Sequence, residues 1–203
     1  IVAGIFALVL VGGGLFVFKF NNNGTLLWAT FYGPITVNTD FSNFICTDLA
    51  GNVFITGCTQ NNSFPMANPL AGSYSHGTIA GGEDIFILEF SNAGALIWAT
   101  FYGGVQNDFA YSLCTDASGN VFVTGSTFSA AFPVLSAGTY FQNVSGGSVD
   151  AFILKFSSAG VLMWSTYYGG SGGDVGYAIS ADPSGNIFIT GVTSSNNFPL
   201  ANP

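Results

Sequence analysis

Short runs of apolar and β-branched residues, separated by clusters of Gly, Asn and Ser, extend along the whole chain. The runs are five to nine residues long and rich in Val, Ile, Phe, Tyr, Trp and Thr, a composition typical of β-strands. No ten-residue window shows the 3.6-residue apolar spacing of a capped helix. The pattern therefore predicts an all-β protein.

Four of these segments recur in a fixed order, so the chain is built from repeats. The first segment covers 40–48, 108–116 and 174–182, the second 52–57, 120–125 and 186–191, the third 15–20, 84–90 and 150–156, and the fourth 26–33, 96–103 and 162–169. Trp28 and Trp98 are 70 residues apart and Trp98 and Trp164 are 66 apart, which gives the repeat length.

The connections between the segments indicate how they pair. The first and second segments are joined by Asp-x-x-Gly-Asn, in which Asp can bond turn amides and Gly or Asn can adopt positive φ. The third and fourth are joined by similarly short turns, and short turns favour antiparallel neighbours. The second and third are separated by 26 residues in one copy and 24 in another, with a Phe-Pro in each. We expect such a long loop to pack on its sheet or to carry function.

The third segment is apolar on both faces, as in Ile85–Leu88. A sheet with one face in water would alternate apolar and polar residues, whereas a sheet between two similar sheets would not. The sequence therefore predicts four-stranded antiparallel blades of the β-propeller type.

Several linked motifs resemble one known family. The series Asp-x-x-Gly-Asn-x-Phe-x-Thr-Gly, Phe-Pro, Asp-Ala-Phe-Ile-Leu-Lys-Phe and Trp-Ser-Thr-Tyr-Tyr-Gly-Gly resembles the SBBP-type β-propeller repeat, over about residues 12–203. The resemblance implies propeller blades and an extracellular or cell-surface setting. It implies no activity, because the family has no catalytic signature to carry over. The chain departs from the pattern at Ile1–Val11 and at Gly33-Pro34.

The phase of the repeat predicts one blade split between the two ends of the sequence. The predicted units are an apolar segment (1–11), the third and fourth strands of the split blade (12–33), two full blades (34–103 and 104–169), and the first and second strands of the split blade (170–203). Three blades cannot close, because closed propellers usually have about four to eight.

Two explanations of the split blade stay open at this point. Strands from neighbouring subunits can complete it head to tail, giving a ring or a filament, and two chains would supply six blades. Alternatively, the blade closes within a longer chain.

The apolar segment Ile1–Val11 has no place in its own repeat, so it is a candidate for a strand donated to a neighbour. Its candidate assembly residues are Ile1, Val2, Ile5, Phe6, Leu8 and Leu10. It is too short to cross a bilayer, so we expect no membrane span.

The charges are few and mostly negative. Ten acids against two lysines and no arginine give a formal charge of −8, and charged residues make up 6% of the chain. Phosphate binding needs clustered cations, so we expect no nucleic-acid partner and no docking on anionic lipid.

All eight Asp residues fall in three columns of the repeat, and two of these columns should share one rim of the sheets. A row of calcium sites is one interpretation, since calcium prefers hard oxygen ligands. Its candidate ligands are Asp40, Asp84, Asp108, Asp150 and Asp174. The preferred interpretation is that each Asp accepts backbone N–H bonds at a turn or strand entry, so that no cofactor is expected.

For other residues that could have a functional role, the sequence favours a structural one. Lys19, Glu89 and Lys155 share one repeat position, for which we prefer a solvated edge over pairing between neighbouring repeats. The three Trp residues are expected to pack between blades, although they could stack sugars. His76 is the single histidine and has no catalytic partner nearby in sequence.

Two kinds of covalent modification are also open from the sequence. The glycosylation sequons are at Asn23, Asn61 and Asn143. A Cys46–Cys58 bridge across the first hairpin is an alternative to buried free thiols, but the third copy has Ser180 and Val192 at these positions.

The inventory of acid–base groups is poor, and no Gly-x-Ser-x-Gly motif occurs, so we expect no enzyme. We expect instead an extracellular structural protein whose propeller repeats are completed by strands from neighbouring subunits. The alternative is an adhesion propeller that binds a glycan or another ligand through its long loops.

Overall fold

The structure is a computed structural model that describes residues 15–32, 41–62, 66–67, 76–136, 138 and 140–200. The described residues form twelve β-strands and no helix, so none of them could cross a membrane as a helix. The strands are β1 (Leu15–Phe20), β2 (Leu26–Tyr32), β3 (Phe41–Thr47), β4 (Val53–Thr59), β5 (Asp84–Phe90), β6 (Leu96–Tyr102), β7 (Asp108–Thr115), β8 (Val121–Thr127), β9 (Asp150–Phe156), β10 (Leu162–Tyr168), β11 (Asp174–Ala181) and β12 (Ile187–Thr193).

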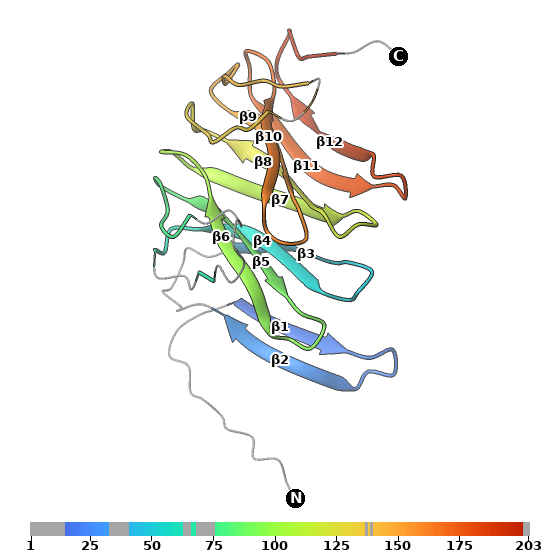
Figure 1. The fold of residues 1–203 in the computed structure, drawn as a ribbon. Coiled ribbons are helices and arrows are strands. Elements are labelled where there is room, and N and C mark those ends of the chain that lie inside the picture. Colours follow the sequence, from blue (N-terminus) through green and yellow to red (C-terminus); the bar gives the residue numbers. More distant parts are fainter. Residues whose placement is uncertain are drawn as a thin grey trace, which may run out of the picture.

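The strands pair into four antiparallel sheets that follow one another along the chain. Two sheets have four strands, in the orders β3-β4-β5-β6 and β7-β8-β9-β10, and we call them the first and second full sheets. The pairs β1-β2 and β11-β12 are two-stranded and are called the N-terminal and C-terminal half-sheets. Figure 1 shows the sheets stacked face to face, with a half-sheet at each end. The all-β prediction and the four-stranded antiparallel sheets are confirmed.

The Asp-x-x-Gly-Asn turns form as the sequence predicts. In the β7–β8 turn, Asp116 Oδ1 accepts hydrogen bonds from the amides of Ser118 and Asn120, each at 2.9 Å. The Asn120 side-chain amide donates to Asp116 Oδ2 at 2.7 Å. Gly119 has a φ of +77°, in the left-handed region that favours glycine. The β3–β4 and β11–β12 turns have the same Asp–Asn bonds, so one local code closes all three hairpins.

Two apolar cores lie between successive sheets. One joins the N-terminal half-sheet to the first full sheet and includes Val17, Phe86 and Phe101. The other joins the two full sheets and includes Ile87 and Phe156. Alternate residues of β5 therefore enter different cores, which explains why this strand is apolar on both faces.

The first strands of the sheets meet one another. Strand β7 contacts β3 on one side and β11 on the other. Innermost first strands are expected if each sheet is a blade arranged around an axis. The described sheets do not close into a ring.

The second long loop packs on its sheet. Phe132 is buried, and its ring centroid lies 5.2 Å from that of Tyr102 and 5.0 Å from that of Phe152. Leu135 and Ser165 exchange backbone hydrogen bonds of 3.1 and 3.0 Å, which fastens the loop to β10. In the first full sheet, the Ala99 amide in β6 donates to the carbonyl of Ala67 at 2.7 Å. Both loops are thus bonded to the fourth strand of a sheet.

The less favoured alternative, a Cys46–Cys58 bridge, is wrong. Cys46 lies opposite Phe54 in the β3–β4 hairpin, whereas Cys58 lies opposite Phe41 at the other end. Neither cysteine forms a disulfide. The apolar segment Ile1–Val11, with its candidate assembly residues, lies outside the described residues.

We expect Gly119→Ala to destabilise the chain by roughly 1–2 kcal/mol, because an L-residue is strained at this φ. The added Cβ would meet only ordinary contacts, the nearest being Ser158 Cβ at 3.4 Å. Urea unfolding measures the difference in the free energy of unfolding. Gly138→Ala is the control, because a Cβ there meets nothing within 4 Å and the backbone is not left-handed. Equal stability of the two variants would contradict the assigned turn geometry.

Candidate functional site

A row of Asp and Thr residues crosses the second full sheet at one rim. Asp108 in β7 lies opposite Thr127 in β8, and Thr127 lies opposite Asp150 in β9. In the first full sheet Thr59 lies opposite Asp84. The first and third Asp columns therefore share a rim, as the strand order predicts.

Each of these carboxylates holds the chain that precedes its strand. Asp108 Oδ2 accepts bonds from the Gly104 amide at 2.7 Å and from the Ser129 hydroxyl at 3.0 Å. Asp174 Oδ2 accepts the equivalent pair of bonds from Gly170 and Ser195, each at 2.7 Å. In the third column, the amide four residues earlier donates to Oδ2 as well: Ala80 to Asp84 at 2.7 Å and Gly146 to Asp150 at 3.1 Å. These bonds match the preferred interpretation of the Asp columns as structural acceptors.

The carboxylates also meet in pairs across the sheet boundaries, beside a glycine. A Cβ on Gly103 would lie 2.7 Å from Asp84 Oδ1 and 2.8 Å from Asp108 Oδ2. A Cβ on Gly169 would lie 2.2 Å from Asp150 Oδ1 and 2.7 Å from Asp174 Oδ2. Glycine is required here by close approach, since any side chain would collide with both carboxylates.

Burial sets the protonation of the first pair. Burial raises the pKa of Asp108 to about 6, and the negative charge of Asp84 contributes to this increase. Hydrogen bonds from Thr127, Gly104 and Ser129 lower the same pKa and offset part of the increase. The pKa of Asp84 is raised by burial as well, although His76 acts in the opposite direction.

For a calcium site, the structure brings together two carboxylates at each boundary between sheets, beside Gly103 and beside Gly169. Among the described residues, no group of three or more His, Cys, Asp or Glu side chains lies close enough together to hold a metal ion. Calcium takes about six to eight oxygen ligands, so a carboxylate pair alone does not fit it. Asp40, the remaining candidate ligand, lies outside the described residues.

The shared position of Lys19, Glu89 and Lys155 lies at the opposite rim and is not a uniform solvated edge. Glu89 is 2% exposed, between Phe54 and Trp98 on the neighbouring strands. Burial raises its pKa to about 7, and the charge of Asp48 adds to the rise. The expectation of a solvated edge is therefore wrong for Glu89, because the second full sheet covers this face.

Lys155 makes its contacts within its own sheet. Its Nζ lies 3.9 Å from Asp116 Oδ2 and 4.9 Å from the centroid of the Phe122 ring. The third equivalent, Lys19, donates to the carbonyl and side-chain oxygens of Asn92 in the next sheet. The repeat position thus takes either charge, according to what surrounds it.

The open surfaces of the molecule are the faces and edges of the two half-sheets. Strand β12 is exposed along nearly its whole length, whereas its equivalents β4 and β8 are fully buried. Phe188 is 63% exposed, but the equivalent Phe54 and Phe122 are 0% and 2% exposed. At the other end of the stack Phe16, Phe18, Phe20, Leu26, Leu27 and Phe31 are exposed.

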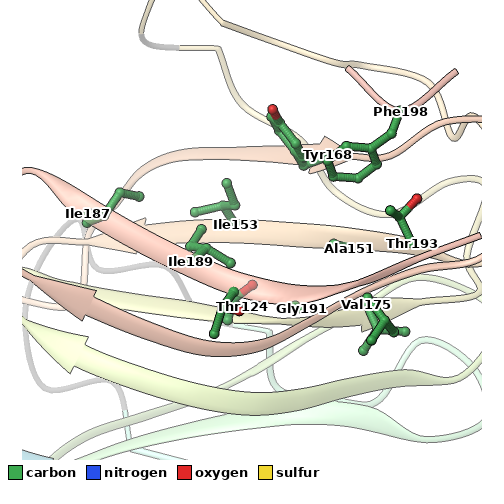
Figure 2. A pocket seen from close by; sticks show the side chains of 13 residues that line it. Thr124, Ala151, Ile153, Tyr168, Val175, Ile187, Ile189, Gly191, Thr193 and Phe198 are labelled. Carbon is green, nitrogen blue, oxygen red and sulfur yellow. The ribbon is translucent and has the colours of Figure 1, made fainter. Parts of the chain in front are cut away.

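A groove of about 490 Å³ lies between the C-terminal half-sheet and the second full sheet. Figure 2 shows Ile153 of β9 and Ile189 of β12 among its lining side chains. Tyr168 and Phe198 lie together at one end, with ring centroids 5.2 Å apart. The lining is mainly apolar, as expected of a surface that packs against another sheet.

A second groove, of about 380 Å³, lies over the fourth strand of the second full sheet. It is lined by Trp164 and Tyr168 together with long-loop residues that include Tyr140 and Phe141. The two grooves share Ile153 and Tyr168, so they form one continuous apolar face.

In the other sheets, the tryptophan of the fourth strand is covered by a turn of the following sheet. A Cβ on Gly94 would lie 2.9 Å from the Trp28 ring, and a Cβ on Gly160 would lie 3.0 Å from the Trp98 ring. Each turn glycine therefore packs on the tryptophan of the preceding sheet, which confirms packing between sheets for Trp28 and Trp98. Trp164 instead faces the groove.

The repeated order of the strands agrees with the comparison to protein families. Residues 97–133 and 164–199 match the model described as the SBBP beta-propeller repeat. These two segments are similar to that repeat. Each match begins in the fourth strand of one sheet and ends near the Phe-Pro that follows the second strand of the next. The matched segments therefore span the boundary between two sheets, and each includes a glycine that lies between two carboxylates.

Two curated proteins are similar to the chain. The uncharacterized WD repeat-containing protein L264 of Acanthamoeba polyphaga mimivirus is 25% identical over 201 residues, which is 90% of this chain and 14% of that protein. The regulatory protein FlaEY of Caulobacter vibrioides (strain ATCC 19089 / CIP 103742 / CB 15) is 26% identical over 118 residues, which is 58% of this chain and 12% of that protein. The chain thus spans a small part of the length of each.

The glycosylation sequons differ in exposure. The sequons at Asn23 and Asn143 have exposed asparagines, and Asn61 is half-buried. The sequence did not predict the carboxylate pairs, the packing of glycine on tryptophan or the burial of Glu89. The carboxylate pairs had one signal in the sequence: a glycine, Gly103 or Gly169, follows the same Tyr at the end of the fourth segment in both repeats.

We expect the free energy of unfolding to fall by roughly 1–3 kcal/mol as the pH rises from about 4 to about 8. The pKa values of Asp108 and Glu89 are raised in the folded state, so the folded chain holds more protons than the unfolded chain in this range. Thermal unfolding at pH 5 and pH 8 measures the effect, with a higher melting temperature at pH 5. Glu89→Gln should reduce the difference, and a chain that is more stable at pH 8 would contradict the assignment.

Proposed function

We propose that this SBBP-repeat chain is a non-catalytic structural scaffold of the extracellular space, which assembles when strands from neighbouring subunits complete its half-sheets. The contrast between β12 and its buried equivalents β4 and β8 carries the proposal. In the full sheets this strand is paired with a third strand and lies between two neighbouring sheets, whereas β12 has neither a third strand nor a following sheet among the described residues.

The composition of the open surfaces supports assembly over a role in solution as a single chain. Phe188, Ile189 and Val192 of β12 are between 38% and 63% exposed. Burying apolar surface contributes about 25 cal/mol per Å², so a partner that covers these side chains gains substantial free energy. Exposed strand edges add backbone donors and acceptors that pair with a further strand. Completion of the sheet satisfies both.

The non-catalytic and extracellular parts of the proposal have separate support. Both oxygens of Asp116 and one oxygen of Asp174 accept hydrogen bonds from turns and loops, which supports a structural role for these side chains. The resemblance to SBBP repeats implies a secreted or surface-attached protein. The low content of charged residues fits a surface that is largely covered by other subunits.

A second candidate function is binding of a glycan or another surface ligand, as in adhesion. The groove that contains Trp164, Tyr140 and Tyr168 favours it, because aromatic rings can stack on sugars. Glycan-array binding that is lost in Trp164→Ala, together with a chain that stays monomeric, would favour this function over assembly.

Sedimentation of the full chain under native conditions tests assembly. We expect species heavier than the 21.0 kDa chain, with a mass that increases with concentration. Ile189→Glu places a charge on the open apolar face and should shift the chain toward the monomer. Leu49→Glu is the matched control, since Leu49 is 86% exposed in the β3–β4 turn. A wild-type monomer at every concentration, or equal effects of both variants, would contradict the proposal.

A further inference from the structure

We infer that each carboxylate pair between neighbouring sheets binds one hard divalent metal cation of the magnesium type. The pairs are Asp84 with Asp108 and Asp150 with Asp174. The inference goes beyond the proposed function, because it concerns the interior of a single chain and does not depend on assembly. It rests on carboxylate oxygens that the loops and turns leave without a hydrogen bond.

Each pair contains a buried oxygen that approaches the partner carboxylate and accepts no hydrogen bond. All four Asp residues are 0% exposed. Asp84 Oδ1 and Asp150 Oδ1 have no hydrogen-bond partner among the described residues. These two atoms are the ones that approach the boundary glycines, together with an oxygen of the partner carboxylate. The loop that precedes Asp150 bonds only to its other oxygen, Oδ2, so Oδ1 is left for another ligand.

Two buried carboxylates at such a short distance require compensation of their charge. Removing a carboxylate from water is costly unless it is paired, and a like charge beside it adds to the cost. The chain has no arginine and two lysines. Lys155 lies beside Asp116, and Lys19 donates to Asn92, both at the opposite rim. Neither lysine therefore compensates a pair.

The second boundary also differs from the first in its loop residue. At the first boundary His76 lowers the pKa of Asp84, against the effect of burial. The equivalent residue of the second long loop is Gln142, since the carbonyls of both residues accept an amide of the fourth strand. Gln142 has no charge, and its side-chain oxygen accepts a bond from the Gly169 amide at 3.1 Å. It thus brings a neutral oxygen to the boundary instead of a cation.

Further neutral oxygens lie beside the second pair. Ser145 Oγ lies 2.5 Å from Asp150 Oδ2, and Ser195 Oγ lies 2.7 Å from Asp174 Oδ2. Together with Gln142, the boundary has carboxylate, hydroxyl and amide oxygens, which are the ligands that hard cations prefer. Magnesium is usually held by one or two carboxylates and keeps several waters, whereas calcium takes about six to eight oxygens. A carboxylate pair therefore fits Mg²⁺ better than Ca²⁺.

A cation in this position joins two sheets. Asp150 begins β9 of the second full sheet, and Asp174 begins β11 of the C-terminal half-sheet. The backbone already connects these strands, because the Asp174 amide donates to the Val149 carbonyl at 2.9 Å. Coordination by both carboxylates adds a second connection at the same rim. Because the cation binds the folded chain, free Mg²⁺ should stabilise the fold.

Calorimetric titration of the full chain with MgCl₂, after removal of metals by a chelator and dialysis, tests the inference. We expect two Mg²⁺ per chain, one for each pair. Asp150→Asn should lower this number to one, because its oxygen can keep the bonds of Oδ2 while its NH₂ group replaces Oδ1 and cannot bind a cation. Asp182→Asn is the matched control, since it removes the same charge from a turn at the opposite rim.

Thermal unfolding is a second measurement, which does not depend on a count of sites. About 10 mM MgCl₂ should raise the melting temperature of the wild-type chain by at least about 3 °C, relative to NaCl of equal ionic strength. The double variant with Asp84→Asn and Asp150→Asn should show no such increase. We expect it to fold, because each new NH₂ group can donate to the partner carboxylate. CaCl₂ should raise the wild-type melting temperature less than MgCl₂ does.

The outcomes decide between a cation and a proton in the pairs. Two sites in the wild-type chain and one in Asp150→Asn support the inference. Absence of Mg²⁺ binding and of stabilisation by Mg²⁺ overturns it, and a shared proton then compensates each pair. Equal losses in Asp150→Asn and Asp182→Asn overturn it as well, because they indicate attraction to the net charge. A larger effect of CaCl₂ overturns the assignment to Mg²⁺.

Discussion

Each sheet of this protein must be covered on both faces, and the rest of the structure depends on this constraint. The central strands carry large apolar side chains in both directions, so a sheet left alone would expose a row of Phe, Ile and Leu on each side. In β5, Phe86 is buried against the sheet before it and Ile87 against the sheet after it. Stacking is therefore the source of stability, and the end faces are where the requirement is unmet among the described residues. Strands that are fully buried in the full sheets become exposed in the half-sheets although their sequences are nearly the same.

The polar residues of the repeat serve the same stack. One oxygen of each rim carboxylate holds the loop that leads into its strand, and the carboxylate lies beside a glycine shared with the neighbouring sheet. The hairpin Asp residues do the corresponding work at the other rim by binding two amides and the Asn side chain. With few lysines available, these acids accept N–H and O–H hydrogen bonds more often than they form ion pairs. Some of their buried oxygens, such as Asp150 Oδ1 and Asp174 Oδ1, have no hydrogen-bond partner among the described residues.

Local and periodic features could be predicted from the sequence, and contacts between sheets could not. The strands of the full sheets and the glycine turns followed from runs such as Ile85–Leu88 and from Asp-x-x-Gly-Asn, because both depend on residues near in sequence. Burial of Glu89 was missed because only the position of the second full sheet decides whether that face is wet. The pairing of Asp84 with Asp108 joins strands from different sheets, and the spacing of the Asp columns contains no information about distance across a boundary. The disulfide alternative failed for a related reason, since register places Cys46 and Cys58 at opposite ends of a hairpin.

The loops bonded to β6 and β10 limit how the full sheets can pair edge to edge with another chain. Backbone groups of the outermost strand of a sheet usually offer a template for another chain, and proteins must block it to avoid lateral aggregation. Here the exchange of bonds between Leu135 and Ser165, and the bond from Ala99 to Ala67, occupy part of that template on both full sheets. Edge-to-edge pairing of the full sheets into a cross-β ribbon is thereby opposed.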